Sequence, residues 1–229
     1  MTHWRTLLER MLAGLDALDA LGFALEDWTL GGGTALMIAT EHRISRDVDV
    51  FINSPEYLPY LSPRLGGEAV WTCDAYEEAA NFLKLRFPEG EIDFIVARAI
   101  TPLPPRRVPI DLAGGGSAAE ALIPLEHPVE IALKKLFFRG PSLLVRDAFD
   151  ICVVDSLVSD ELHAHLHLVA GRKRAIQTSV GRLSPDFVKR SLGELDILPA
   201  WAEMAATTHE RILSIIDSIP DEPLGTTAA

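Results

Sequence analysis

The sequence contains no apolar run that approaches the roughly 20 residues a membrane-spanning helix needs. Its N-terminus, MTHWRTLLERML, is charged and amphipathic and lacks the continuous apolar core of a signal peptide. Cysteine is scarce too, because Cys73 and Cys152 are the only two and form no metal-binding or redox motif. These absences predict a cytoplasmic protein with reduced thiols and no membrane association.

Basic residues are also in short supply, with 21 Lys and Arg against 33 Asp and Glu and a formal net charge of −12. This balance argues against indiscriminate binding of nucleic acid, which needs clustered cations to neutralise phosphates. The charge is uneven, however, because residues 127–190 hold ten Lys and Arg against seven Asp and Glu. The acidity therefore belongs to the two ends of the chain, and the middle is suited to face a polyanion.

Hydrophobic periodicity predicts mixed strands and helices in the first half of the chain. Apolar residues at helical spacing predict an amphipathic helix over residues 3–21, and residues 23–30 read as a short strand before Gly31-Gly32-Gly33. A compact helix is expected from Thr34, and a helix or irregular connection over residues 55–65. Further strands are expected at residues 47–51, at 82–87 and 92–96 as a hairpin, and at 108–112.

The second half of the chain reads as helical from Pro128 to about Ile219, and Gly114-Gly115-Gly116-Ser117 is the most linker-like segment. We therefore expect an α+β fold with a mixed α/β domain at residues 1–113 and a helical domain at 117–220. The tail at residues 221–229 is short and polar, and we expect it to be disordered.

Two local patterns point to phosphate and metal chemistry. Gly32-Gly33-Thr34 opens a helix, where glycines let backbone N–H groups approach phosphate oxygens and the helix dipole favours negative charge. Thirteen residues after Thr34, Asp47 and Asp49 alternate with apolar residues, so both carboxylates are expected on one face of a strand. Like charges so placed repel each other unless a cation lies between them, which predicts a Mg²⁺-nucleotide site.

Asp93 is the expected third carboxylate. It lies inside the otherwise apolar run Ile92-Asp93-Phe94-Ile95-Val96, where a charge is costly to bury without compensation. If this strand lies beside that of Asp49, three carboxylates meet and can hold two divalent ions, Mg²⁺ or Mn²⁺. Asp93 is then also placed to take a proton from an acceptor hydroxyl. An aspartate at a strand edge facing water is the alternative.

The string LGGGTALMIATEHRISRDVDVF resembles the opening motifs of the AbiEii/AbiGii abortive-infection toxins, which are nucleotidyltransferases of the DNA-polymerase-β superfamily. In that family a helix starting with Gly-Gly-Thr-Ala-Leu precedes a strand of the pattern His-Arg-x-Ser-x-Asp-(Ile/Val)-Asp-(Leu/Val)-Phe. This sequence supplies the pattern in order, with His42, Arg43, Ser45, Asp47, Asp49 and Phe51. The resemblance implies a polymerase-β-like mixed sheet flanked by helices, followed by a C-terminal helical region.

A second string, EIALKKLFFRGPSLLVRDAFDI, is similar to the later family motif of Lys, then Arg, then Arg/Lys-Asp-x-x-Asp. Lys135 and Arg139 are spaced i, i+4 and share a helix face, and Asp147 and Asp150 are spaced i, i+3 on the next helix. The resemblance implies that Lys135 contacts the triphosphate while the two aspartates position it. Lys134 is a rival for this role, and a purely structural ion network is the alternative for Arg139 and Asp150.

The resemblance implies transfer of a nucleoside monophosphate from a nucleoside triphosphate such as ATP to a hydroxyl, with release of pyrophosphate. The implied acceptor is RNA, tRNA in some relatives, or a protein, and the implied setting is a toxin–antitoxin or phage-defence pair with a cognate antitoxin. Arg43 and Ser45 become candidate phosphate contacts beside Gly32, Gly33 and Thr34, because the fork of an arginine suits phosphate oxygens. An antibiotic-modifying nucleotidyltransferase and a non-catalytic binding module are the alternatives.

Overall fold

The computed structural model describes residues 3–65, 68–112 and 120–221. The chain divides into two compact units that interleave along the sequence. Unit 1 comprises Met1–Ala39, Ser45–Ala99 and Pro104–His127, and unit 2 comprises Thr40–Ile44, Ile100–Leu103 and Pro128–Ala229. Each unit therefore has to be understood from segments that are far apart in the sequence.

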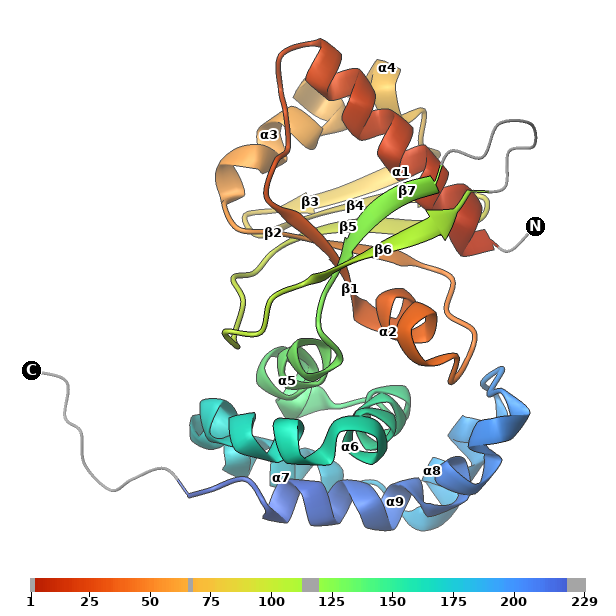
Figure 1. Cartoon of the computed structure of the whole chain (residues 1–229), viewed down its shortest axis with the longest axis vertical. Helices are drawn as coiled ribbons and strands as arrows, with labels where there is room; N and C mark the ends of the chain where they lie inside the picture. The colour runs from red at the N-terminus through yellow and green to blue at the C-terminus, as the bar shows by residue number, and fades with distance from the viewer. Residues whose placement is uncertain (1–2, 66–67, 113–119, 222–229) are drawn as a thin grey trace, which may run out of the picture. The chain divides into compact units, whose positions relative to one another are not determined.

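Unit 1 is built on one mixed sheet, in which the described residues form seven strands in the order β3-β4-β5-β2-β1-β7-β6 (Figure 1). β5 pairs with β2 and β1 with β7 in parallel, and the remaining pairs are antiparallel. The strands are β1 (Trp28–Gly31), β2 (Val48–Ile52), β3 (Ala75–Ala79), β4 (Phe82–Phe87), β5 (Gly90–Val96), β6 (Arg106–Asp111) and β7 (Glu120–Leu125).

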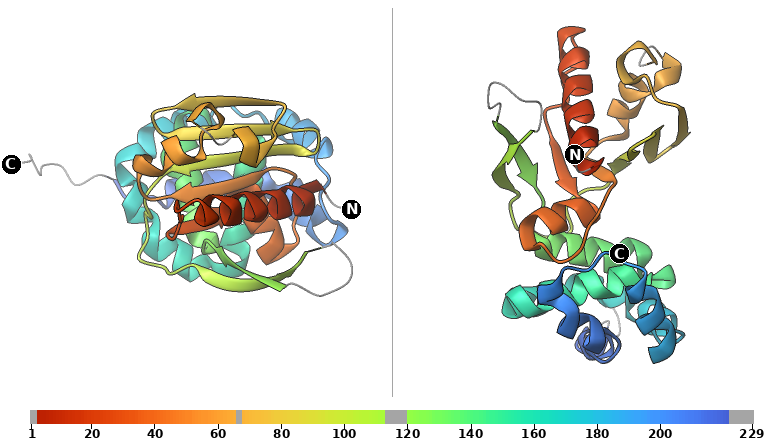
Figure 2. Two further views of the ribbon diagram at one scale, coloured as in Figure 1. Left: turned by 90° about the horizontal axis from the view of Figure 1, so that it is seen from above. Right: turned by 90° about the vertical axis from the view of Figure 1, so that its right-hand side faces the viewer.

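Alternation along the central strands gives the sheet one buried apolar face and one partly buried face, which is called the polar face because it carries Asp49 and Asp93. Val48 and Val50 of β2 and Ile92 and Phe94 of β5 are fully buried, and helix α1 (His3–Ala20) packs against these two strands (Figures 1 and 2). The intervening side chains of the same strands are only partly buried. Because side chains alternate between the faces of a strand, they point to the opposite side of the sheet.

The other helices of unit 1 are short. α2 (Gly32–Thr40) follows β1 without a break and buries Thr34, Ala35, Leu36 and Met37. α3 (Leu58–Leu61) and α4 (Glu68–Trp71) are single turns, accompanied by 3₁₀ turns at Pro55–Tyr57 and Pro63–Leu65. Trp71 of α4 packs where Gly14 leaves room in α1, so the sheet's apolar face is closed by this layer.

Unit 2 is helical, with α5 (Pro128–Arg139), α6 (Val145–His165), α7 (Lys173–Val180), α8 (Pro185–Gly193) and α9 (Ala202–Asp217) and 3₁₀ turns between them. Its core includes Val145, Phe149 and Val153 of α6 packed against Val188 and Leu192 of α8. The segment 40–44 joins this unit through a β-bridge between Arg43 and Ile197 and through the hydrogen bond from Ile44 N–H to the Asp196 carbonyl.

The α+β class, the mixed sheet and the C-terminal helical region are as predicted, and so is the hairpin of β4 and β5. The first strand is shorter than expected, and β3 and β7 were not anticipated. Because β7 belongs to the sheet, the helical part begins at Pro128 and not at residue 117. The linker glycines and the tail at residues 222–229 lie outside the described residues.

No helix in the described ranges has both the length and the apolar character needed to cross a membrane.

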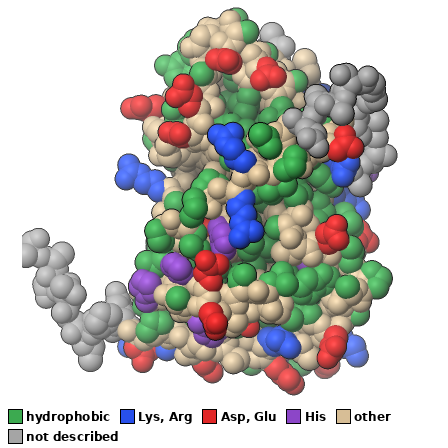
Figure 3. All heavy atoms as spheres, viewed as in Figure 1, with side chains coloured by type: hydrophobic (Ala, Val, Ile, Leu, Met, Phe, Trp, Pro, Cys, Tyr) green, Lys and Arg blue, Asp and Glu red, His purple; other side chains and the backbone are tan. Residues whose placement is uncertain are grey.

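On the face drawn in Figure 3, acidic, basic and hydrophobic side chains are interspersed.

Candidate active site

One row of residues, named the acidic row, crosses the polar face of the sheet on four neighbouring strands. Lys84 of β4 lies opposite Asp93 of β5, Asp93 lies beside Asp49 of β2, and Asp49 lies opposite Gly31 of β1. Directly paired residues in neighbouring strands point to the same side of a sheet with their Cβ atoms about 5 Å apart. The register therefore brings the predicted carboxylates Asp49 and Asp93 together.

The start of α2 lies against this row. Gly32 has a φ of +64°, and a side chain there would overlap the carboxylate of Asp49. The hydroxyl of Thr34 donates to the backbone carbonyl of Asp47, which ties the first turn of α2 to the residue that precedes β2. The glycine motif and the acidic motif are thus joined in space as the sequence predicted, and the Thr34 hydroxyl serves that connection.

Asp47 lies one residue before β2 and is exposed. Its Oδ1 accepts a hydrogen bond from the backbone N–H of Glu91 at 3.1 Å, so its carboxylate is held at the beginning of β5. Among the described residues, no group of three or more His, Cys, Asp or Glu side chains lies close enough together to hold a metal ion. The structure thus brings Asp49 and Asp93 together as a pair, and a third ligand from Asp47 stays a prediction.

The environment of Asp93 shifts its acidity. Burial and the nearby charge of Asp49 raise the pKa of Asp93, the hydrogen bond from Lys84 opposes them, and the net result is a pKa of about 6. Its Oδ2 accepts from Lys84 Nζ at 2.9 Å, while its buried Oδ1 has no hydrogen-bond partner in the part of the chain that is described. A buried, unpaired carboxylate oxygen beside a second carboxylate is the environment that a cation would satisfy, so this pair fits a divalent ion.

Lys84 was not singled out from the sequence. Its ammonium lies between two acids of β5 and donates to Glu91 Oε2 at 2.5 Å as well as to Asp93. Burial lowers the pKa of Lys84, but the hydrogen bonds with Glu91 and Asp93 raise it more, so the net shift is upward. Its polar position in the alternating run FLKLRF could have indicated that Lys84 lies on the same face as the acids. Its pairing with Asp93, however, depends on the register of the hairpin.

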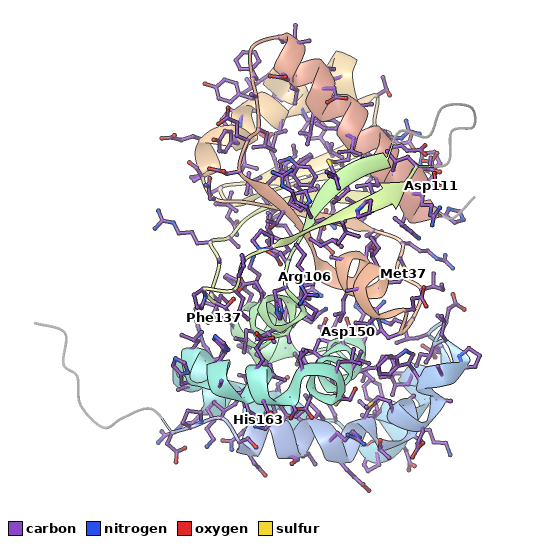
Figure 4. All side chains as sticks on the ribbon, viewed as in Figure 1. Met37, Arg106, Asp111, Phe137, Asp150 and His163 are labelled. Atoms are coloured by element: carbon purple, nitrogen blue, oxygen red, sulfur yellow. The ribbon has the colours of Figure 1, made fainter. Side chains whose placement is uncertain are left out.

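The second predicted motif forms a buried ion network within unit 2, and Asp150, one of its members, is labelled in Figure 4. Lys135 Nζ of α5 lies 2.7 Å from Asp147 Oδ1 and 3.1 Å from Asp150 Oδ2, both on α6. Arg43 binds Asp150 through two nitrogens, each at 2.8 Å, and His42 Nε2 lies 2.8 Å from Asp150 Oδ1. Both aspartates are completely buried, so the positive charges of Lys135 and Arg43 compensate negative charges that would otherwise be costly to bury.

The charges of the network act on Asp150. Burial alone would raise its pKa, but the charges of Lys135 and Arg43 and the hydrogen bond from His42 hold that pKa well below its usual value. Arg139 also reaches Asp147, at 3.3 Å, although its side chain is 45% exposed. Lys134, the rival of Lys135, lies 3.6 Å from Glu130 on its own helix, so Lys135 is the lysine that meets the motif's aspartates.

Arg43 and Ser45, the two candidate phosphate contacts, already have hydrogen-bond partners within the protein. The guanidinium of Arg43 donates to Asp150 and to the carbonyl of Ile44, so these partners already take up most of its five N–H donors. The Ser45 backbone N–H points to Met37 Sδ at 3.2 Å. The sequence predicts no role for His42 beyond its place in the motif. Its buried contact with Asp150 depends on a fold that brings together residues 108 positions apart.

Residues 15–221 of the chain match the model of a protein family described as nucleotidyl transferase AbiEii toxin, Type IV TA system. A comparison with the curated proteins found none that matches. The matched range contains every residue of the acidic row and of the buried ion network.

Proposed function

The chain belongs to the AbiEii family of nucleotidyl transferase toxins and is a nucleotidyltransferase, and we propose that it transfers a nucleoside monophosphate from a nucleoside triphosphate to a hydroxyl group with the help of a divalent cation. The observation that carries this proposal is the pairing of Asp49 with Asp93 next to the glycine-started helix α2. Two carboxylates beside a phosphate-binding helix start suit a metal–triphosphate complex.

The residues of unit 1 supply three parts of the reaction. Asp49 and Asp93 would hold Mg²⁺ or Mn²⁺, and such an ion neutralises charge that develops on the transferring phosphoryl group. The backbone N–H groups in the first turn of α2 are left without partners inside the helix and can donate to phosphate oxygens. Asp93 lies beside Asp49 in the strand register, and we propose it as the group that takes the proton of the attacking hydroxyl.

Further contacts follow from the family motif and stay proposals. Lys135 is proposed as a phosphate contact, with Asp147 and Asp150 holding it in place through the ion pairs described above. We further propose ATP or another triphosphate as the donor, RNA or a protein as the acceptor, and a cognate antitoxin as partner, since the family is assigned to toxin–antitoxin systems.

The proposal is tested by incubating the purified protein with Mg²⁺, total cellular RNA and protein, and each triphosphate labelled at its α-phosphate. Asp49→Asn should lower transfer of label by at least about 100-fold, the upper range for disturbing a metal's surroundings. Asp16→Asn makes the same chemical change at an exposed position of α1 and is the control. Equal labelling by wild type and Asp49→Asn would refute the assignment of this site.

A further inference from the structure

We propose that Lys84 is a built-in cation of the acidic row: its ammonium occupies one cation position between Glu91 and Asp93, and this keeps divalent ions from binding tightly before a nucleotide arrives. This inference rests on the metal-dependent function proposed above. It makes Lys84 a positioning residue, because it acts through the carboxylates and not on the substrate.

The position of Lys84 is fixed by the sheet itself. β4 pairs with β5 along its whole length, and Lys84 faces Asp93 in that register. Its ammonium reaches both neighbouring acids on its side of β5, Glu91 and Asp93, and the Lys84 side chain is only 23% exposed. The ammonium of Lys84 thus bridges these two carboxylates through charge-assisted hydrogen bonds.

The charges on this face explain why such a cation is useful. Asp47, Asp49, Glu91 and Asp93 bring four carboxylates to the beginnings of two adjacent strands. Lys84 satisfies Oδ2 of Asp93 and leaves the buried Oδ1 of the same carboxylate unpaired. Asp93 can therefore offer its Oδ1 to a metal ion while Lys84 holds its Oδ2. The carboxylate of Asp93 then cannot bind an ion through both of its oxygens.

Glu91 is neutralised from two sides, since Arg86 Nε also lies 3.1 Å from its Oε1. Arg86 is two residues from Lys84 on the same strand and faces the same side of the sheet, but its ion pairs are with Glu91 and Glu77. It thus provides a matched control, because removing it deletes one positive charge from the same face and leaves the pair of Lys84 and Asp93 in place.

The experiment measures binding of Mn²⁺ to the metal-free full chain without nucleotide, by the electron paramagnetic resonance signal of free Mn²⁺. Lys84→Met is expected to bind Mn²⁺ at least about tenfold more tightly than wild type, because a like charge near the divalent ion is gone. Arg86→Met and the charge-conserving Lys84→Arg should both stay within about threefold of wild type, since each keeps a cation beside Asp93. Circular dichroism verifies folding, with Lys84→Gln as a second neutral variant.

Unchanged or weaker Mn²⁺ binding by both neutral variants of Lys84 would overturn the inference while wild-type binding still upheld the metal site. An equal gain in Arg86→Met would also overturn it, because general charge and not the position of Lys84 would then explain the effect. Absence of Mn²⁺ binding in wild type and in all variants would remove this inference together with the metal-dependent function.

Discussion

At residue 32 two requirements for glycine coincide. The backbone has a φ of +64°, which other residues adopt at a cost, and the space where a side chain would begin is taken by the carboxylate of Asp49. The positive φ affects only the stability of the turn, whereas the close approach of Asp49 couples the turn to the carboxylate pair proposed to bind the metal. The two effects can be separated because Gly22 has a similar φ of +87° with no atom within 4 Å of the position of an added Cβ.

Gly32→Ala should therefore lower nucleotidyl transfer by about 100-fold, as expected when a reactive group is displaced by about 1 Å. Gly22→Ala should lose a similar part of its stability to backbone strain, about 1 kcal/mol, but keep its activity. Thermal unfolding and transfer of α-phosphate label are measured on both proteins. Full activity in Gly32→Ala would show that the close approach to Asp49 has no role in the reaction.

The two cysteines should differ in reactivity. Burial raises the pKa of the Cys152 thiol to about 12, so the thiol stays protonated at ordinary pH, and the thiolate is the reactive form. Cys73 is partly exposed. In the native protein at about pH 8, iodoacetamide should modify Cys73 and spare Cys152, as read by peptide mass spectrometry, whereas the denatured chain should react at both. Native labelling of Cys152 would contradict its burial.

The carboxylates of the site were predictable because their signal is local. Asp49 and Asp93 each interrupt a short apolar run, and a period of two places each of them on the polar face of its strand. Lys84 and His42 were not predictable in their roles, because each depends on a partner brought near by pairing across the fold. The residues that could be predicted are those whose role is indicated by the residues next to them in the sequence.

Among the elements, α5 and α6 are joined by a set of buried ion pairs. Asp150 is fully buried on α6 and is compensated by Lys135, Arg43 and His42. Removing the charge of one member leaves the others in a poorly solvated place, which usually costs about 3–5 kcal/mol. The motif therefore contributes to folding whatever its part in the reaction.

Asp150→Asn should lower the free energy of unfolding by about 3 kcal/mol near pH 7. The folded-state pKa of Asp150 lies below its unfolded value, so its stabilisation is present above about pH 4 and is lost as the pH falls through the folded-state pKa. Urea unfolding should thus show the two proteins converging in acid. Asp160→Asn, at an exposed position of the same helix, is the control, and a difference that persists at low pH would contradict this account.

The elements that sequence reasoning missed lack the alternation on which it depends. Every residue of β3 is exposed and its sequence is AYEEA, so the strand exists because β4 pairs with it and not because it buries a face. β7 follows the glycine-rich segment and contains Pro124, which reads as a break in a strand. The hairpin of β4 and β5 was predictable, since both strands alternate clearly around a short turn.

At the scale of the whole molecule, neighbours in sequence belong to different units. Residues 40–44 run from the last residue of α2 into the connection to β2, yet they belong to the helical unit. Their nearness to Asp47 and Asp49 in the sequence suggested a phosphate contact for Arg43, whereas in the structure its guanidinium is bonded to Asp150. Such interleaving cannot be read from one chain, because local patterns do not say which core a short connecting segment joins.

The interleaving predicts that the helical unit cannot be isolated by a cut before Pro128. A fragment of residues 128–229 would lose Arg43 and His42 from Asp150, and it would lose Ile100 and Thr101, whose backbone N–H groups donate to Glu130. Two buried carboxylates would then lack most of their partners, and unpaired buried charges oppose folding strongly. We expect the fragment to show little cooperative thermal unfolding by circular dichroism, in contrast to the full chain.

The same fragment carrying Asp150→Asn and Glu130→Gln separates this cause from a general loss of contacts. Neutral amides cost less to bury than unpaired carboxylates, so the doubly substituted fragment should regain part of the cooperative transition, whereas in the full chain both substitutions should destabilise. A wild-type fragment that unfolds at the temperature of the full chain would show that residues 40–44 and 100–103 are dispensable. The double substitution should therefore stabilise the fragment and destabilise the full chain. This difference is expected only if residues 40–44 and 100–103 supply the charged and hydrogen-bonding partners of the two buried carboxylates.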